Sequence, residues 1–328
     1  MLRVVQLKHL ILAGSDYIDK IWGTKLRERL RTVKYRRELF RLHLYNWRIY
    51  RHAQVFGFIQ IETYSPCNRR CSCCPVGYKK RRVTRMSDSL FRRIIDQLAE
   101  RNYQGEIALH FYNEPLLEKR LPNFISYAHQ KCPKSFIYFA SNGDYLTIEM
   151  FRELIKRGLS QLVLSQYDPV PKERLRIFLE SADDNDWKYF TFERKVVEEY
   201  TWSNRAGSIP KWRINEPLKQ RCTRPEVQMI INAQGQVPLC CNDYFGEESL
   251  GDVSRENVFD IWNSKRAKEI RSHLRKANRH KIKLCSGCDW HNEGVRYSRK
   301  RTAYDTDRAP WSPADFDYRR PVSRSYRA

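Results

Sequence analysis

The sequence lacks long hydrophobic runs. No stretch approaches the roughly 20 consecutive apolar residues that a membrane-spanning helix needs. Near the start of the chain, Arg3 and Lys8 interrupt the apolar residues between Met1 and Gly14, so no apolar segment of signal-peptide length is present. We therefore expect a cytoplasmic protein with no transmembrane segment.

Acidic residues are scarce relative to basic ones. The 328 residues include 61 Lys and Arg but only 38 Asp and Glu, which gives a formal net charge of +23 and a pI near 9.7. A charge of this size predicts an acidic partner, such as nucleic acid, a membrane surface or a phosphorylated substrate. Apolar residues make up 41% of the chain, enough for a core, and the length fits one large domain and a smaller one.

Cysteine is plentiful, and its spacing is informative. Among ten cysteines, Cys67, Cys71 and Cys74 form a CX3CX2C group directly after residues 58–64, which predict a strand. Without an export signal, clustered cysteines favour metal binding over disulfides. Three thiolates on one loop can converge on an iron–sulfur cluster and leave one of its four irons open. A zinc loop or unrelated buried cysteines are the alternative interpretations.

Strand and helix patterns alternate from about residue 58 to residue 193. Helices are expected over 87–101, 121–131, 147–157 and 171–181, and further strands over 106–111, 136–140, 161–165 and 187–192. Ser87 and Thr147 are the expected N-caps of two of these helices. The alternation predicts a parallel sheet with helices outside it and a reactive site at the carboxyl ends of the strands.

A second set of cysteines lies in the C-terminal part of the chain. It consists of Cys222, Cys240, Cys285 and Cys288. Between the first two, residues 228–232 and 236–240 flank Gly235 and predict a β-hairpin, and a helix is expected over 264–277. Four thiolates suffice for one fully ligated cluster, and Cys241 is adjacent as a substitute ligand. A four-cysteine zinc ribbon would use the same set equally well.

Together these motifs resemble the radical SAM superfamily. In that family the three cysteines bind a [4Fe–4S] cluster whose open iron chelates S-adenosylmethionine (SAM), and segments at successive strand ends contact the rest of SAM. The resemblance implies cofactor-binding roles for Tyr112, Asn113, Glu114, Pro115, Ser141, Asn142 and Ser165. The chain departs from the family pattern at Cys73, where an aromatic residue is usual, and at Tyr112 and Asn113, which replace two glycines.

The second cysteine set resembles the SPASM/twitch extension of radical SAM enzymes. No cysteine follows Cys288, as in the shorter twitch version with one auxiliary cluster. The resemblance implies two [4Fe–4S] clusters and an α/β fold, a partial (β/α)6 radical SAM barrel with a small C-terminal domain of β-hairpin and helix. The expected domains are a basic helical N-terminal extension (1–55), the barrel (56–215), the auxiliary iron–sulfur domain (216–292) and a basic, Pro-containing tail (293–328).

The resemblance also implies an oxidoreductase or epimerase. In the family, SAM cleavage gives a 5′-deoxyadenosyl radical that removes a hydrogen atom, and a fully ligated auxiliary cluster suits electron transfer. Asn204-Arg-Ala-Gly207 is similar to segments of twitch enzymes that act on cyclitols and sugars, so Arg205 is an expected substrate contact. We expect dehydrogenation of a sugar-like or cyclitol alcohol, or epimerisation with Cys73, Cys132 or Cys241 as the hydrogen donor. An external one-electron reductant such as flavodoxin or ferredoxin is implied.

Two other functions stay open at this point. Twitch and SPASM enzymes often modify ribosomally made peptides, and a basic enzyme would suit an acidic precursor. Residues 1–55, however, do not show the strands of the winged-helix domain that many such enzymes carry. The other alternative is a non-catalytic basic protein that binds nucleic acid through a zinc ribbon.

The N-terminal extension predicts a basic helix. Residues 25–51 contain ten Lys and Arg against Glu28 and Glu38. A stripe with steps of three or four, broken only by Arg37, consists of Leu26, Leu30, Val33, Arg37, Phe40 and Leu44. Such a helix either packs on the main domain or forms a surface for acidic lipid or a polyanion.

Overall fold

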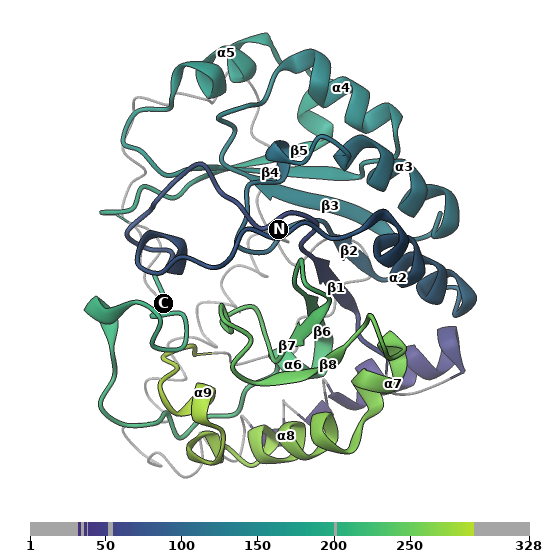
Figure 1. Ribbon diagram of the computed structural model, residues 1–328, viewed down its shortest axis with the longest axis vertical. Helices are drawn as coiled ribbons and strands as arrows, with labels where there is room; N and C mark the ends of the chain where they lie inside the picture. Colours follow the sequence, from purple (N-terminus) through teal and green to yellow (C-terminus); the bar gives the residue numbers. More distant parts are fainter. Residues whose placement is uncertain (1–31, 34–35, 38, 52–54, 200–201, 292–328) are drawn as a thin grey trace, which may run out of the picture.

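The structure, a computed structural model, describes residues 32–33, 36–37, 39–51, 55–199 and 202–291 (Figure 1). The expectations for residues 1–31 and for the tail over 293–328 therefore lie outside the described residues. No helix among the described residues combines the length and the apolar character needed to cross a membrane.

Six parallel strands form the main sheet, in the order β5-β4-β3-β2-β1-β6. They are β1 (Phe58–Ile61), β2 (Glu106–Ala108), β3 (Phe136–Ser141), β4 (Gln161–Gln166), β5 (Phe190–Arg194) and β6 (Gln228–Ile231). The connecting helices lie on the outer side of the sheet (Figure 1) and are α2 (Asp88–Glu100), α3 (Leu121–Lys131), α4 (Ile148–Lys156) and α5 (Glu173–Ser181). The expected α/β partial barrel is confirmed.

The expected helix caps are present. The side chain of Ser87 accepts a hydrogen bond from the backbone N–H of Leu90, and that of Thr147 accepts one from Met150. Between these ends and the sheet, α2 buries Phe91, Ile94, Ile95 and Leu98, which recur every three or four residues and contact the main core. Capping and periodicity therefore fix the same helix boundaries.

The expected hairpin over 228–240 is wrong in its pairing. Residues 228–231 form β6, which pairs in parallel with β1 and completes the main sheet. The Oδ1 atom of Asn232 accepts hydrogen bonds from the N–H groups of Gln234 and Gln236, and the chain turns there into a separate sheet. Strand β7 (Gln236–Pro238) pairs antiparallel with β8 (Ser249–Asp252). The run Met229-Ile-Ile231 is apolar without alternation, as suits a strand buried on both faces of a parallel sheet.

The remaining helices surround the small sheet. They are α6 (Arg224–Val227), α7 (Val258–Asn263), α8 (Lys265–Arg275) and α9 (Lys283–Ser286). Short 3₁₀ helices are η1 (Pro75–Gly77), η2 (Pro115–Leu117), η3 (Asp186–Lys188), η4 (Pro210–Trp212) and η5 (Arg279–Lys281). The small domain lies below the open edge of the barrel in Figure 1, so the loops after β1 and β2 face it.

The expected N-terminal helix is present in the described residues, but the described members of the predicted stripe, Val33, Arg37, Phe40 and Leu44, are exposed and do not pack on the barrel. Residues 39–50 are helical, and Leu42, which the stripe omits, is 1% exposed and contacts Val227. The Nδ2 atom of Asn46 donates to the carbonyl of Val55 at 2.7 Å, and the hydroxyl of Tyr50 accepts from the N–H of Gln104 at 3.1 Å. The helix is thus attached to the barrel through its other face.

Candidate active site

The first cysteine set lies on the loop between β1 and η1. Cys67, Cys71 and Cys74 are partly buried, whereas Cys73 is 2% exposed. The loop returns closely on itself at Gly77, where a Cβ atom would lie 2.5 Å from the carbonyl oxygen of Cys71. The three cysteines of the CX3CX2C group are therefore held on one tight loop at the carboxyl end of β1.

A buried arginine ties this loop to two other strand ends. Arg69 donates from Nε and Nη2 to the carboxylate of Asp144, at 2.8 and 2.5 Å, and from Nη1 to Asp168 at 2.8 Å. Asp144 follows β3 and Asp168 follows β4. Sequence reasoning missed this clamp, although Arg69 lies inside the cysteine motif and Asp144 directly follows Asn142-Gly143. Tyr167, whose ring lies 5.9 Å from the guanidinium of Arg69, was also missed.

Glu114 is the centre of a polar group at the same edge of the sheet. It is 2% exposed and accepts hydrogen bonds from the hydroxyl of Ser141 at 2.7 Å and the N–H of Asn142 at 3.0 Å. Burial raises the pKa of Glu114 to about 7. Among the described residues, no cation forms an ion pair with this carboxylate. The ammonium group of a bound ligand would therefore supply the positive charge that balances it. Asn142 continues the network through Nδ2 to Asn68 on the cysteine loop, at 3.0 Å.

The other predicted SAM contacts are divided between two places. Ser165 is 3% exposed on β4, and Tyr167, two residues further on, lies beside Arg69 of the first cysteine loop. Pro115 begins η2, and Asn113 accepts from the N–H of Phe111. Tyr112 instead donates its hydroxyl proton to the carbonyl of Cys241, at 2.8 Å. Tyr112 therefore links the barrel to the small domain.

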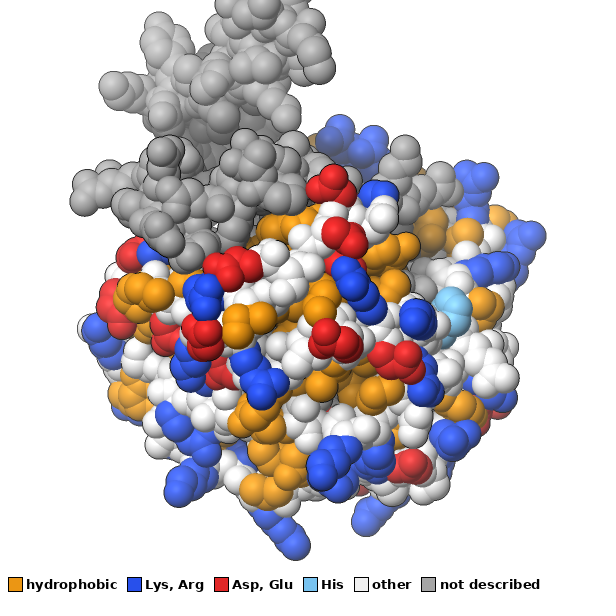
Figure 2. Space-filling model, turned by 90° about the horizontal axis from the view of Figure 1, so that it is seen from above, with side chains coloured by type: hydrophobic (Ala, Val, Ile, Leu, Met, Phe, Trp, Pro, Cys, Tyr) orange, Lys and Arg blue, Asp and Glu red, His pale blue; other side chains and the backbone are white. Residues whose placement is uncertain are grey.

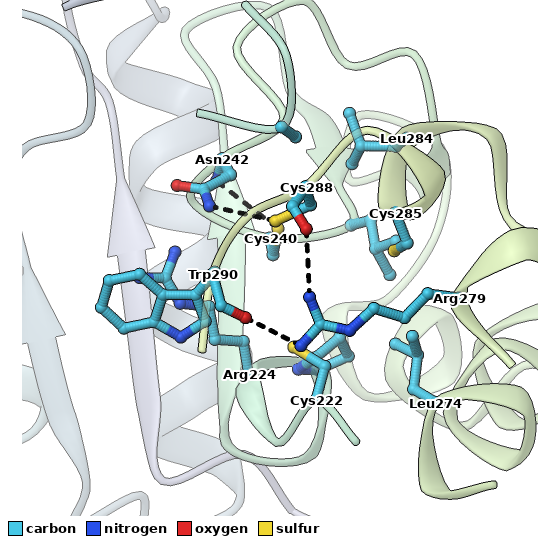
Figure 3. Close-up of a pocket in the computed structure, with 13 residues that line it drawn as sticks. Cys222, Arg224, Cys240, Asn242, Leu274, Arg279, Leu284, Cys285, Cys288 and Trp290 are labelled. Carbon is cyan, nitrogen blue, oxygen red and sulfur yellow. Dashed lines mark hydrogen bonds between the residues drawn. The ribbon is translucent and has the colours of Figure 1, made fainter. Parts of the chain in front are cut away.

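The second cysteine set lines one cavity (Figure 3). The four cysteines are Cys222, Cys240, Cys285 and Cys288. Asn242 donates its backbone N–H to the sulfur of Cys240 at 3.4 Å and its Nδ2 to the sulfur of Cys288 at 3.7 Å. Arg279, 1% exposed, binds the carbonyls of Gln220 and Trp290 at 2.9 and 2.8 Å and fixes the segments around the cavity.

Both donor sets suit soft metal centres. Burial raises the pKa of Cys67 to about 12, and it also raises the pKa values of Cys222, Cys240 and Cys285. Such thiols stay protonated unless bound metal supplies positive charge. Within the described ranges, no three His, Cys, Asp or Glu side chains are grouped around one metal-ion position. A four-iron cluster does not need such a group, because its four thiolates bind four different irons.

Arg205 lies between the two cysteine sets. It interacts electrostatically with Tyr112, Cys241 and Cys74, which come from both domains. Its φ is 50°, and the φ values of Ala206 and Gly207 are 54° and 81°, an unfavourable conformation for the first two residues. Asn204 holds the turn by donating Nδ2 to the carbonyl of Gly287, at 2.8 Å, next to Cys288. The turn that carries Arg205 is therefore both strained and tightly held.

The three unassigned thiols occupy different surroundings. Cys241 lies 2.5 Å from Nη1 of Arg224 and close to Arg205. Cys73 is buried on the first cysteine loop. Cys132 belongs to the hydrophobic core, with its sulfur 3.9 Å from the carbonyl of Ile95. Only Cys73 and Cys241 among these three therefore lie beside a cysteine set.

Residues 61–186 match the profile of the Radical SAM superfamily. This part of the chain is a radical SAM domain. Residues 222–289 match the SPASM family, described as an iron–sulfur cluster-binding domain, which decides against the zinc ribbon. This radical SAM enzyme therefore uses SAM and [4Fe–4S] clusters as cofactors.

Individual relatives agree with this assignment. The chain is 27% identical over 239 residues to the S-adenosyl-L-methionine-dependent 2-deoxy-scyllo-inosamine dehydrogenase of Niallia circulans, covering 72% of this chain and 94% of that protein. The crystal structure of BtrN in complex with AdoMet and 2-DOIA matches with a TM-score of 0.66 and 26% identity, over 72% of this chain and 93% of that one. Streptococcus suis SuiB bound to the precursor peptide SuiA matches at a TM-score of 0.50 and 13% identity, over 76% and 78% of the chains, and shows the fold alone.

Proposed function

We propose that this radical SAM enzyme oxidises a hydroxyl group of a cyclitol or sugar-like substrate to a ketone. The position of Arg205 carries this proposal, because its guanidinium interacts with Cys74 of the first set, and the turn that holds it is hydrogen-bonded to Gly287, next to Cys288 of the second set. The similarity to 2-deoxy-scyllo-inosamine dehydrogenase over most of that protein's length supports the substrate class. Peptide modification has only the distant likeness to SuiB in its favour.

The proposed roles follow the geometry of the two sites. Cys67, Cys71 and Cys74 hold the cluster that binds SAM, and the clamp of Arg69 keeps their loop at the sheet edge. Glu114 accepts a hydrogen bond from the amino group of SAM, and Ser141, Asn142 and Ser165 lie beside this group. The remaining predicted contacts, Tyr112, Asn113 and Pro115, border this region. The auxiliary cluster is held by Cys222, Cys240, Cys285 and Cys288.

Oxidation of a carbinol to a ketone removes one hydrogen atom, one proton and one electron. When bound, SAM and its reduced cluster supply the radical that takes the hydrogen atom, and the auxiliary cluster supplies the electron acceptor. Arg205 orients the hydroxyl group and stabilises the negative charge that develops as its proton leaves. The wall of Tyr112, Cys241 and Arg205 closes the space between the domains and limits access of water to the substrate radical.

Arg205→Ala should lower turnover about 100-fold while both clusters remain, because a lost charge stabiliser typically costs this much. Turnover is measured as ketone formed per chain by mass spectrometry, and the clusters are measured by iron and sulfide analysis. Arg205→Lys is the matched control and should recover part of the rate. An alanine variant with the wild-type rate would contradict the assignment of Arg205.

Glu114→Gln should weaken SAM binding about 10- to 100-fold, since a hydrogen bond to a charged group contributes about 1.5–3 kcal/mol. The pKa of Glu114 is raised to about 7, so the wild-type carboxylate loses its charge as the pH falls below this value. SAM affinity should therefore decline below about pH 7 in the wild type and not in the glutamine variant. Equilibrium dialysis with labelled SAM measures both effects, and an equal pH dependence in the two proteins would contradict the role.

Epimerisation is the rival outcome at the same site. It would need a hydrogen donor for the substrate radical, and Cys241 is the thiol that lies close to Arg205. Solvent deuterium at an inverted carbon, with no ketone formed, would move the assignment to epimerisation. A Cys241→Ser variant would then lose product while it retained SAM cleavage.

The proposed setting is the cytoplasm, with flavodoxin or ferredoxin as the one-electron reductant. SAM cleavage consumes one electron per event, so an external donor is needed to start the reaction. The proposed domains remain 1–55, 56–215, 216–292 and 293–328, although β6 lies after residue 215 and belongs to the barrel sheet. The basic N-terminal helix is proposed as a surface for an acidic partner.

A further inference from the structure

The outward face of the N-terminal helix carries an apolar stripe. The exposed fractions of Val33, Phe40, Leu44 and Trp47 are 64%, 67%, 47% and 52%. Their spacings of seven, four and three residues place them on one face of a helix. Single exposed apolar side chains are ordinary on a protein surface, whereas a continuous row of them marks an interaction site.

The stripe is presented by a helix that is firmly attached to the barrel. Leu42 contacts Val227 beside the main sheet, and Asn46 and Tyr50 hydrogen-bond to the barrel backbone. Tyr50 also stacks on Tyr103, with ring centroids 6.2 Å apart. The contacts that hold the helix therefore use the face opposite the stripe, and they leave the stripe available to a partner.

Arginines flank the stripe on both sides. Arg36, Arg37, Arg41 and Arg48 are exposed, and Glu38 is the one acidic residue in the sequence from 32 to 51. The guanidinium of Arg51 lies 5.4 Å from the ring centroid of Trp47, so charge and apolar surface are directly adjacent.

The face over α4 and α5 provides the contrast. There acidic and basic side chains intermix (Figure 2). Arg152 pairs with Asp183 and Asp186, and Arg176 pairs with Glu173 and Glu180. The arginines of this face are therefore paired with acidic residues, whereas residues 32–51 hold six Lys and Arg against one Glu.

We propose that the N-terminal helix docks this enzyme on an anionic membrane surface. Arginines would contact lipid phosphates while Phe40, Leu44 and Trp47 enter the boundary between headgroups and acyl chains, as amphipathic interfacial helices do. A nucleic acid would use the arginines but would leave the apolar stripe in water. A second copy would bring two rows of arginines together, which is unfavourable. The observations thus favour a lipid surface over both alternatives.

The test is flotation of the full-length enzyme, with its clusters reconstituted, on two kinds of vesicle. One contains phosphatidylcholine alone, and the other contains equal parts of phosphatidylcholine and phosphatidylglycerol. The wild type should bind the anionic vesicles at low salt. It should bind them more weakly at physiological ionic strength, where the Debye length shortens to ~8 Å. It should bind neutral vesicles at least about tenfold less tightly.

Three variants separate the components of binding. Phe40→Ser with Leu44→Ser and Trp47→Ser should weaken binding to anionic vesicles at least about tenfold, because the apolar contribution is removed. Arg36→Gln with Arg37→Gln, Arg41→Gln and Arg48→Gln should weaken it by at least a similar factor. Met150→Ser with Ile177→Ser, on α4 and α5, removes exposed apolar side chains elsewhere and should bind like the wild type. All three should cleave SAM at the wild-type rate, which shows that they are folded.

Three results would overturn the proposal. The first is a wild type that ignores anionic vesicles. The second is a serine variant that binds them, and the polyanion heparin, as tightly as the wild type, which would indicate a purely electrostatic surface. The third is a wild-type dimer in light scattering that the serine substitutions dissociate, which would assign the stripe to a second copy of the chain.

Discussion

Replacing Cys67, Cys71 and Cys74 with alanine should abolish SAM cleavage and remove about half of the iron, since one of two four-iron clusters would be lost. The expectation follows from their common loop and from the SAM-binding groups next to it. Glu114 is joined to this loop through Asn142 and Asn68, so loss of the cluster removes the centre to which bound SAM is directed. Iron and sulfide analysis measures the cluster, and chromatography of 5′-deoxyadenosine measures cleavage.

Cys132→Ala is the matched control for this triple variant. Cys132 is buried in the hydrophobic core and lies at neither cysteine set, so its replacement should leave iron content and SAM cleavage unchanged. Continued formation of 5′-deoxyadenosine by the triple variant would show that the first site is assigned wrongly.

Replacing Cys285 and Cys288 with alanine should separate two steps of the reaction. Hydrogen abstraction requires the first cluster and SAM, whereas formation of the ketone also requires removal of an electron from the substrate radical. The variant should therefore still cleave SAM, more slowly, but release little ketone. Both products are measured in one reaction mixture, and the ratio of ketone to 5′-deoxyadenosine is the decisive quantity.

The second variant needs a test of folding, because loss of a cluster can unfold the domain that it holds. Arg279 holds backbone carbonyls around the cavity through hydrogen bonds that do not involve the cysteines, which favours a folded variant. Circular dichroism and SAM binding check this point. A folded variant that lacks the second cluster and makes ketone at the wild-type rate would rule out an electron-accepting role.

The sequence predicted those features that depend on local chemistry. The caps at Ser87 and Thr147 were predictable because a hydroxyl group next to an apolar period satisfies backbone donors within one turn. The two cysteine sets were predictable because their spacing is itself the constraint on ligation. The resemblance to a family added the polar strand ends, and the structure brings Glu114, Ser141 and Asn142 together as expected.

The features that sequence reasoning missed depend on contacts between distant segments. The pairing of β6 with β1 joins residues that are far apart in the chain, and the turn at Gly235 favoured the nearer partner. The clamp of Arg69 on Asp144 and Asp168 likewise joins three loops. In the N-terminal helix the period was predicted correctly, but periodicity alone does not say which face meets the barrel. There Leu42 and Asn46 were the decisive contacts.

The central claim, oxidation of a carbinol carbon by a SAM-derived radical, is tested most directly by isotope transfer. The reconstituted enzyme is incubated with SAM, a reductant and 2-deoxy-scyllo-inosamine carrying deuterium on its carbinol carbons, and a small set of similarly labelled cyclitols and sugars is tested in parallel. The account predicts deuterium in 5′-deoxyadenosine together with an equal amount of ketone from at least one of these compounds. Cleavage of SAM that transfers no deuterium from any of them, with transfer from a peptide substrate instead, would contradict it.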